Sequence, residues 1–199
     1  MDVDELKLLL GNTEAHRFCS QHLFSDDMWL FDGQSEISVN GDYQYFRDTI
    51  SAKLGLSAED VALVGSSKYG FSLNPKPTKT YQPFHEESDL DVVIVGEDLF
   101  ERTWGAFREA YYNGYSWIKA RHESDVFRRF VLLLPEENYK TVYLRSTSRL
   151  MDEMAVEVGQ KTGINRKLKY RIYADWEAAL NYYTHGLEKL QRSLNHDTQ

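Results

Sequence analysis

A nearly continuous apolar stretch at residues 90–95 (LDVVIV) constrains the fold more than any other feature of this sequence. It consists mainly of β-branched residues and is bounded by Asp89 and Gly96, which is typical of a strand that is covered on both faces. A second short apolar run at 61–65 (VALVG) ends in glycine, and residues 167–173 alternate between basic and apolar side chains. The three segments predict a small mixed sheet.

Amphipathic segments before, between and after these strands predict helices that cover the sheet, so the expected fold class is α/β (α+β). We expect helices over residues 2–10, 13–24, 43–54, 98–112, 124–134, 150–158 and 175–194. Residues 25–42 are typical of a loop or a short hairpin. Residues 74–88 carry three of the four prolines and predict a surface loop.

The length indicates one folded domain over residues 1–199. Within it we expect an N-terminal helical and loop segment (1–42), a core (43–174) and a C-terminal amphipathic helix (175–199). The apolar positions of that last helix recur at alternating spacings of four and three residues, which predicts packing on the chain's own sheet or, alternatively, a homodimer or partner-protein interface. These positions are Trp176, Leu180, Tyr183, Leu187, Leu190 and Leu194.

The composition excludes several classes of protein. The 31 acidic residues outnumber the 23 Lys and Arg residues, so the net charge of −8 does not favour a nucleic-acid-binding protein, although it leaves room for a local basic groove. The single cysteine, Cys19, excludes an internal disulfide framework. No apolar run approaches the roughly 20 residues of a membrane span, and the acidic N-terminus is unlike a secretory signal. We therefore expect a cytoplasmic protein with no membrane partner.

Two acids at the start of the central strand predict a metal site. Asp89 and Asp91 are two residues apart, and side chains alternate along a strand, so both carboxylates project from the same face. Two neighbouring carboxylates repel each other unless a cation lies between them. Oxygen ligands of this kind suit Mg²⁺ or Mn²⁺, and Mg²⁺ is usually held by one or two carboxylates together with substrate phosphates.

The segment that follows the first strand predicts a phosphate site. Gly65 ends the strand and allows close approach of an anion to the backbone, and Ser66 and Ser67 begin what we expect to be a helix. The two hydroxyls can donate hydrogen bonds, and Lys68 can add a positive charge. The segment is not a P-loop, because GxxxxGK[ST] is absent.

A strand, then Gly65-Ser66, then Ser88-Asp89-x-Asp91 on the next strand resembles the signature of the DNA polymerase beta-type nucleotidyltransferase superfamily, in particular its stand-alone bacterial members. The resemblance implies a nucleotidyltransferase fold and transfer of a nucleoside monophosphate from a nucleoside triphosphate (NTP) to a hydroxyl acceptor. It implies that Asp89 and Asp91 bind the metal ions, and that Gly65 and Ser66 with nearby amides hold the phosphates.

The sequence departs from the family pattern at two places. The gap between Ser66 and Asp89 is longer than usual in the family, and the excess falls in the 74–88 loop, which is placed to gate or select a substrate. The family also supplies a third acid from a later strand. Asp175 is the candidate, but an Asp directly before an amphipathic helix is equally a preferred N-cap.

The acceptor cannot be derived from the residues, and a small molecule, a protein side chain, a tRNA end and a second nucleotide all remain open. The resemblance implies a toxin–antitoxin or phage-defence role, since stand-alone members often have one. The alternative function is a nucleotide-binding or partner-binding module with a degenerate site. The basic side chains of 167–173 are interpreted either as a strip near the phosphates or as the solvent face of an edge strand.

Overall fold

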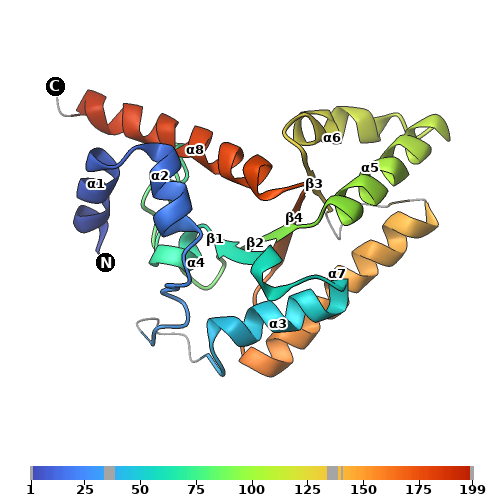
Figure 1. Cartoon of the computed structure of the whole chain (residues 1–199), viewed down its shortest axis with the longest axis horizontal. Helices are drawn as coiled ribbons and strands as arrows, with labels where there is room; N and C mark the ends of the chain where they lie inside the picture. Colours follow the sequence, from blue (N-terminus) through green and yellow to red (C-terminus); the bar gives the residue numbers. More distant parts are fainter. Residues whose placement is uncertain (1, 34–38, 134–138, 140, 198–199) are drawn as a thin grey trace.

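The structure is a four-stranded mixed sheet with helices on both faces, as the sequence predicts for the fold class (Figure 1). This computed structural model describes residues 2–33, 39–133, 139 and 141–197. The strands are β1 (Val61–Val64), β2 (Leu90–Val95), β3 (Phe130–Leu132) and β4 (Leu168–Tyr173). The α-helices are α1 (Val3–Asn12), α2 (Ala15–Phe18), α3 (Tyr43–Leu54), α4 (Ser66–Tyr69), α5 (Glu97–Tyr112), α6 (Trp117–Phe127), α7 (Val142–Thr162) and α8 (Trp176–Asp197). A π-helix, η1 (Cys19–Leu23), follows α2, and a 3₁₀ helix, η2 (Ala58–Asp60), precedes β1.

The strand order is β1-β2-β4-β3, which places the two longest strands at the centre. β2 and β4 are parallel, with Leu90 level with Leu168, whereas β1 and β3 pair antiparallel with their neighbours. In the β1–β2 pair, Val64 lies opposite Asp91. The end of β1 and the start of β2 therefore lie at the same edge of the sheet.

The alternation of side chains along β2 divides the core into two layers. Leu90, Val92 and Ile94 face one layer, together with apolar residues of α3, α5 and α7. Val93 and Val95 face the other, together with residues of α1, α2 and α8. Figure 1 shows the first group of helices on one side of the sheet and α1, α2 and α8 on the other. Asp91 belongs to the α8 side by the same alternation.

The C-terminal helix packs on the chain's own sheet. Leu187 and Leu190 are buried in the α8-side layer, and Trp176, Leu180 and Tyr183 pack against it. Gln191 Nε2 donates to the carbonyl oxygens of Leu10 and Thr13 at 2.6 and 2.8 Å, which ties α8 to the end of α1. The apolar seam is thus used inside the chain, which confirms the prediction that it packs on the chain's own sheet.

Strongly patterned local segments were predicted accurately. α3 covers residues 43–54 and β2 covers residues 90–95, both as predicted. Asp42 caps α3 by accepting a hydrogen bond from the amide of Tyr45 at 2.8 Å, and Gly55 ends it with a φ of 68°. In the 25–42 segment the described residues form turns, so the loop prediction holds there, whereas 34–38 lie outside the described residues.

The prediction of a helix over 124–134 is wrong. α6 lies earlier and ends at Phe127, and the apolar residues that follow form β3. Arg129 turns the chain between them with a φ of 58°, and its carbonyl accepts a hydrogen bond from the amide of Ala174. A short apolar run fits a buried strand and a buried helix equally well, so periodicity could not separate the two. Residue 134 lies outside the described residues.

The helix predicted at 150–158 is the middle of a much longer one. α7 begins after Thr141, whose hydroxyl accepts a hydrogen bond from the amide of Leu144 at 3.3 Å. The first turns are rich in Ser and Thr, which have modest helix propensity and hide the helix start in the sequence. Within the helix, the hydroxyl of Thr147 donates a hydrogen bond to the carbonyl of Tyr143 at 3.0 Å, so this polar group is satisfied although the side chain is buried.

None of the helices in the described part of the chain combines the length and the apolar character needed to cross a membrane.

His122 of α6 makes the fold sensitive to acid. It is 2% exposed, it stacks on Phe107 with ring centroids 4.2 Å apart, and neither ring nitrogen has a hydrogen-bond partner among the described residues. Burial, assisted by Arg121, lowers its pKa from 6.5 to about 4. Between these pH values the unfolded chain binds the extra proton, so the free energy of unfolding falls as the pH falls.

We expect His122→Phe to remove this acid sensitivity. The difference in unfolding free energy between the variant and the wild type should grow by about 2 kcal/mol from pH 7 to pH 4.5, in favour of the variant. Urea unfolding at several pH values measures it. His16→Gln, at an exposed position of α2, is the control and should follow the wild type. A pH-independent difference for His122→Phe would contradict the assignment.

Candidate active site

The glycine turn and the second acid of the strand are in contact. Gly65 has a φ of 76° and a ψ of −147°, a conformation that is essentially restricted to glycine. A Cβ atom added there would lie 2.9 Å from Asp91 Oδ2. The antiparallel β1–β2 register produces this contact, because it places Val64 opposite Asp91. The two predicted halves of the site are therefore adjacent.

Both acids are neutralised by bases of the neighbouring strand. Arg171 Nη1 donates to Asp91 Oδ1 at 2.7 Å, and Lys169 forms an ion pair with Asp89. The parallel β2–β4 register explains the pairing, because it places these four side chains on the same face of adjacent strands. Since Arg171 occupies Oδ1, Asp91 Oδ2 remains directed at the glycine turn.

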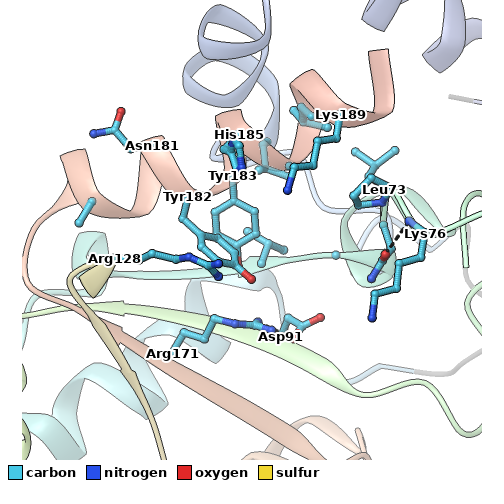
Figure 2. Close-up of a pocket in the computed structure, with 18 of the residues that line it drawn as sticks. Leu73, Lys76, Asp91, Arg128, Arg171, Asn181, Tyr182, Tyr183, His185 and Lys189 are labelled. Carbon is cyan, nitrogen blue, oxygen red and sulfur yellow. Dashed lines mark hydrogen bonds and ion pairs between the residues drawn. The ribbon is translucent and has the colours of Figure 1, made fainter. Parts of the chain in front are cut away.

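The charge on Arg171 is maintained although the side chain is largely buried. Burial acts to lower its pKa, but Tyr183 and Asp91 outweigh burial and hold the pKa above its usual range. The guanidinium also lies 5.9 Å from the ring centroid of Tyr182, a cation–π distance. Figure 2 shows both tyrosines of α8 above the Arg171–Asp91 pair.

A cavity of about 1320 Å³ opens between this face of the sheet and α8. Gly65, Ser66 and Asp91 lie in its wall. Figure 2 shows Asp91 with Arg171 beside it. Its lining contains five Lys and Arg side chains against two carboxylates, the reverse of the overall charge balance of the chain. The bases are Lys76, Arg128, Arg129, Arg171 and Lys189. Such a lining suits a ligand with several negative charges.

The structure directs Ser67 and Lys68 away from this cavity. Ser67 is buried, and its hydroxyl donates to the carbonyl of Val64 at 3.0 Å. Lys68 is 3% exposed, and its ammonium group donates to the hydroxyl and carbonyl of Ser25 and to the carbonyl of Asp27. The prediction that both residues bind phosphate is corrected accordingly: they anchor the turn and the loop beneath it. α4 is a single turn, so its dipole also contributes little.

Burial of Lys68 predicts a measurable pH dependence. Burial lowers its pKa from 10.5 to about 8, against the opposing effect of nearby aspartates. Between pH 8 and 10.5 the unfolded chain binds the extra proton, so Lys68 makes the free energy of unfolding rise with pH there. We expect Lys68→Met to lose this component, which is at most about 1.4 kcal/mol per pH unit.

The measurement is the slope of unfolding free energy against pH from 8 to 9.5, for wild type, Lys68→Met and the exposed control Lys79→Met. Because buried tyrosines and Cys19 contribute slopes of the opposite sign at higher pH, the difference between variants is the informative quantity. Parallel curves for wild type and Lys68→Met would contradict the prediction.

Asp175 lies at the other end of the sheet from the acid pair. Asp91 is level with Lys169, and the strand from Lys169 to Tyr173 alone spans about 13 Å. Asp175 Oδ1 accepts a hydrogen bond from the amide of Ala178 at 2.7 Å, and Oδ2 forms an ion pair with Arg129 at 2.9 Å. The capping interpretation is the correct one, and the proposed role as a third acid is withdrawn.

Several residues of the cavity were not predicted. Lys76 lies in the 74–88 loop, and residues 74–76 of that loop line one end of the cavity, which agrees with a loop beside the site. Arg128 and Arg129 come from the α6–β3 corner, and Lys189 and Tyr182 from α8. Lys189 has one signal in the sequence, its spacing of four residues from His185 on α8, which any solvated helix also shows.

Comparison with protein-family models, with curated proteins and with solved structures found no match.

The acids fit a divalent cation that arrives with its ligand. No group of three or more His, Cys, Asp or Glu side chains gathers within the described ranges of the chain. Asp89 and Asp91 project from one face of the sheet, and Asp91, with its Oδ2 beside Gly65, lines the cavity, whereas Asp89 lies outside the lining. Mg²⁺ ordinarily takes one or two carboxylates when phosphate oxygens complete its shell.

Proposed function

We propose that this chain is an Mg²⁺-dependent nucleotidyltransferase that moves a nucleoside monophosphate from an NTP to a hydroxyl acceptor. The observation that carries the proposal is the contact between the Gly65 turn and Asp91 at the wall of a basic cavity. A turn without a Cβ atom lets phosphate oxygens approach the backbone, and the adjacent carboxylate is where a phosphate-bound cation needs an anionic ligand.

In the proposed reaction the acceptor oxygen bonds to the α-phosphorus of the NTP. The bond from that phosphorus to the oxygen bridging to the β-phosphate breaks, pyrophosphate leaves, and the hydroxyl proton passes to water. Gly65 and Ser66 orient the phosphates, and Asp89 and Asp91 would hold Mg²⁺. When bound, the cation supplies stabilisation of negative charge on the attacking and leaving oxygens.

In the proposed reaction, Lys169 and Arg171 exchange their carboxylate partners, Asp89 and Asp91, for the phosphates of the NTP. In the free protein the two bases neutralise the carboxylates, which would otherwise repel each other. When a triphosphate enters, the same bases can pair with its oxygens, and the carboxylates become available for the cation. Arg171 is suited to this because its guanidinium stays charged throughout.

The same ion pairs favour a second candidate, a nucleotide-binding module with a degenerate site. If Lys169 and Arg171 remain on the acids, the cavity still binds a polyphosphate but holds no cation for transfer. The two functions differ in their dependence on Mg²⁺, because only the enzyme needs the carboxylates to be released.

Calorimetry with each of the four NTPs, with and without Mg²⁺, and pyrophosphate release with candidate acceptors, test the proposal. We expect Mg²⁺ to tighten binding of at least one NTP, and release to occur once a suitable acceptor is present. Binding that is indifferent to Mg²⁺, with no release for any acceptor, would favour the binding module. Absence of NTP binding both with and without Mg²⁺ would overturn both functions.

A further inference from the structure

The cavity has two basic ends with the acid between them. At one end lie Arg128 and Asn181, at the other Leu73 and Lys76, and Asp91 lies between (Figure 2). The two ends are well separated along α8: Asn181 and Lys189, which line opposite ends, are eight residues apart, or about 12 Å along the helix axis. A group-transfer site needs this arrangement, because the reacting groups must meet between two bound ligands.

The volume agrees with two ligands. Pockets for one small molecule are roughly 300–1,000 Å³. The cavity measures about 1320 Å³, which exceeds this range. The loop end, with Lys76, Lys189 and the Gly65–Ser66 turn, already supplies the groups that a triphosphate requires. The bases of the other end are therefore in excess of what the donor needs.

The second end is built by a fixed corner that exposes an aromatic ring. Phe127 is 88% exposed although it lies in the cavity lining. The next residue, Arg128, lies 6.0 Å from the ring centroid of Tyr182. Arg129 adopts a left-handed φ of 58°, a conformation that costs energy for a residue with a side chain, and its backbone carbonyl accepts a hydrogen bond from the amide of Ala174 at 3.0 Å.

An exposed aromatic ring beside guanidinium groups matches one ligand chemistry in particular. Nucleobases stack on aromatic side chains and on guanidinium planes, and phosphates pair with Arg. Burial of an exposed Phe side chain by a planar ring also removes apolar surface from water. A ligand with a base and a phosphate would satisfy Phe127 and Arg128 together.

We propose that the acceptor is itself a nucleoside phosphate, either a free nucleotide or the end of a single-stranded nucleic acid, bound at the Phe127–Arg129 corner. This inference rests on the proposed function. The acceptor hydroxyl then lies between the corner and Asp91, and the NTP lies on the loop side. The transfer is the one described above, with a nucleotide hydroxyl as the attacking group and pyrophosphate as the product that leaves.

Binding measurements at the two ends test the acceptor independently of the donor. The probes are the α,β-methylene analogues of the four NTPs with Mg²⁺ for the donor end, and the four nucleoside monophosphates and a five-nucleotide RNA labelled at its 5′ end for the corner. The variants are Arg128→Glu and Phe127→Ala, with Lys119→Glu on the exposed face of α6 as a charge-matched control. Thermal unfolding confirms that each variant is folded.

We expect both corner variants to weaken binding of the monophosphate or the RNA at least tenfold and to change donor binding less than twofold, with the control unchanged. Tighter binding of the RNA than of the monophosphate identifies a nucleic-acid end, and equal or weaker binding identifies a free nucleotide. If neither acceptor probe binds the wild type, or if both bind regardless of the corner variants, the acceptor assignment is overturned while donor binding still supports the proposed function. Failure of all four donor analogues to bind overturns the proposed function itself.

Discussion

Asp91→Asn is expected to reduce Mg²⁺-dependent pyrophosphate release at least 100-fold. The substitution keeps the size of the side chain and an oxygen that can accept the Arg171 hydrogen bond, but it removes the charge that the proposed Mg²⁺ ion would need. A 100-fold loss corresponds to about 2.7 kcal/mol of transition-state stabilisation. Initial rates of pyrophosphate release at saturating NTP measure the effect directly.

Two controls separate chemistry from stability. Asp98→Asn, at an exposed position in the first turn of α5, should retain the wild-type rate. Denaturant unfolding of Asp91→Asn reports how much the protein loses when Arg171 no longer has an anionic partner. Release within threefold of the wild-type rate would rule out Asp91 as the residue that holds the cation. NTP affinity that survives in Asp91→Asn together with a loss of release is the signature of the enzyme.

Gly65→Ala is expected to damage both binding and stability. An alanine at a φ of 76° and a ψ of −147° is strained, at a cost of about 1–3 kcal/mol of unfolding free energy. The new methyl group would also lie 2.9 Å from Asp91 Oδ2 and displace the carboxylate from the turn. We therefore expect at least a tenfold loss of NTP affinity. Denaturant unfolding and calorimetry measure the two effects separately.

Gly105→Ala provides the matched control. Gly105 lies inside α5, and nothing lies within 4 Å of the position of an added Cβ atom. Alanine is the better helix former, so this variant should gain about 0.5–1 kcal/mol and bind NTP as the wild type does. A Gly65→Ala protein with wild-type stability and affinity would show that the turn neither requires glycine nor contacts the ligand.

The parts of the molecule that follow from local sequence were predicted, and the parts that depend on distant contacts were not. β2 is apolar along nearly its whole length, and α3 has both of its end signals, so each could be located within its own segment. The short distance between Gly65 and Asp91 also follows from two adjacent strands. In contrast, β3 and α6 share an apolar segment in which helix and strand patterns overlap.

The ion pairs of the site depend on the register between β2 and β4, which could not be predicted from the sequence. The alternation of residues 167–173 was visible, but the parallel pairing that places Lys169 and Arg171 against the acids was not. Lys68 was assigned to phosphate because it follows the glycine turn, whereas the loop at Ser25 and Asp27 covers it. Asp175 had two valid interpretations, and only the sheet register distinguishes them.

Because β1 and β2 pair directly, the positions of Gly65 and Asp91 do not depend on the length of the segment that joins the two strands. The intervening segment folds back on itself. The amide of Tyr81 donates to the carbonyl of Ser72 at 2.8 Å, and the amide of Phe84 donates to the carbonyl of Gly70 at 2.7 Å. Lengthening such a closed excursion costs little entropy, since doubling a loop costs only about 0.6 kcal/mol. A change in the length of the segment 74–80 would therefore reshape what the cavity admits while Gly65 and Asp91 stay in place.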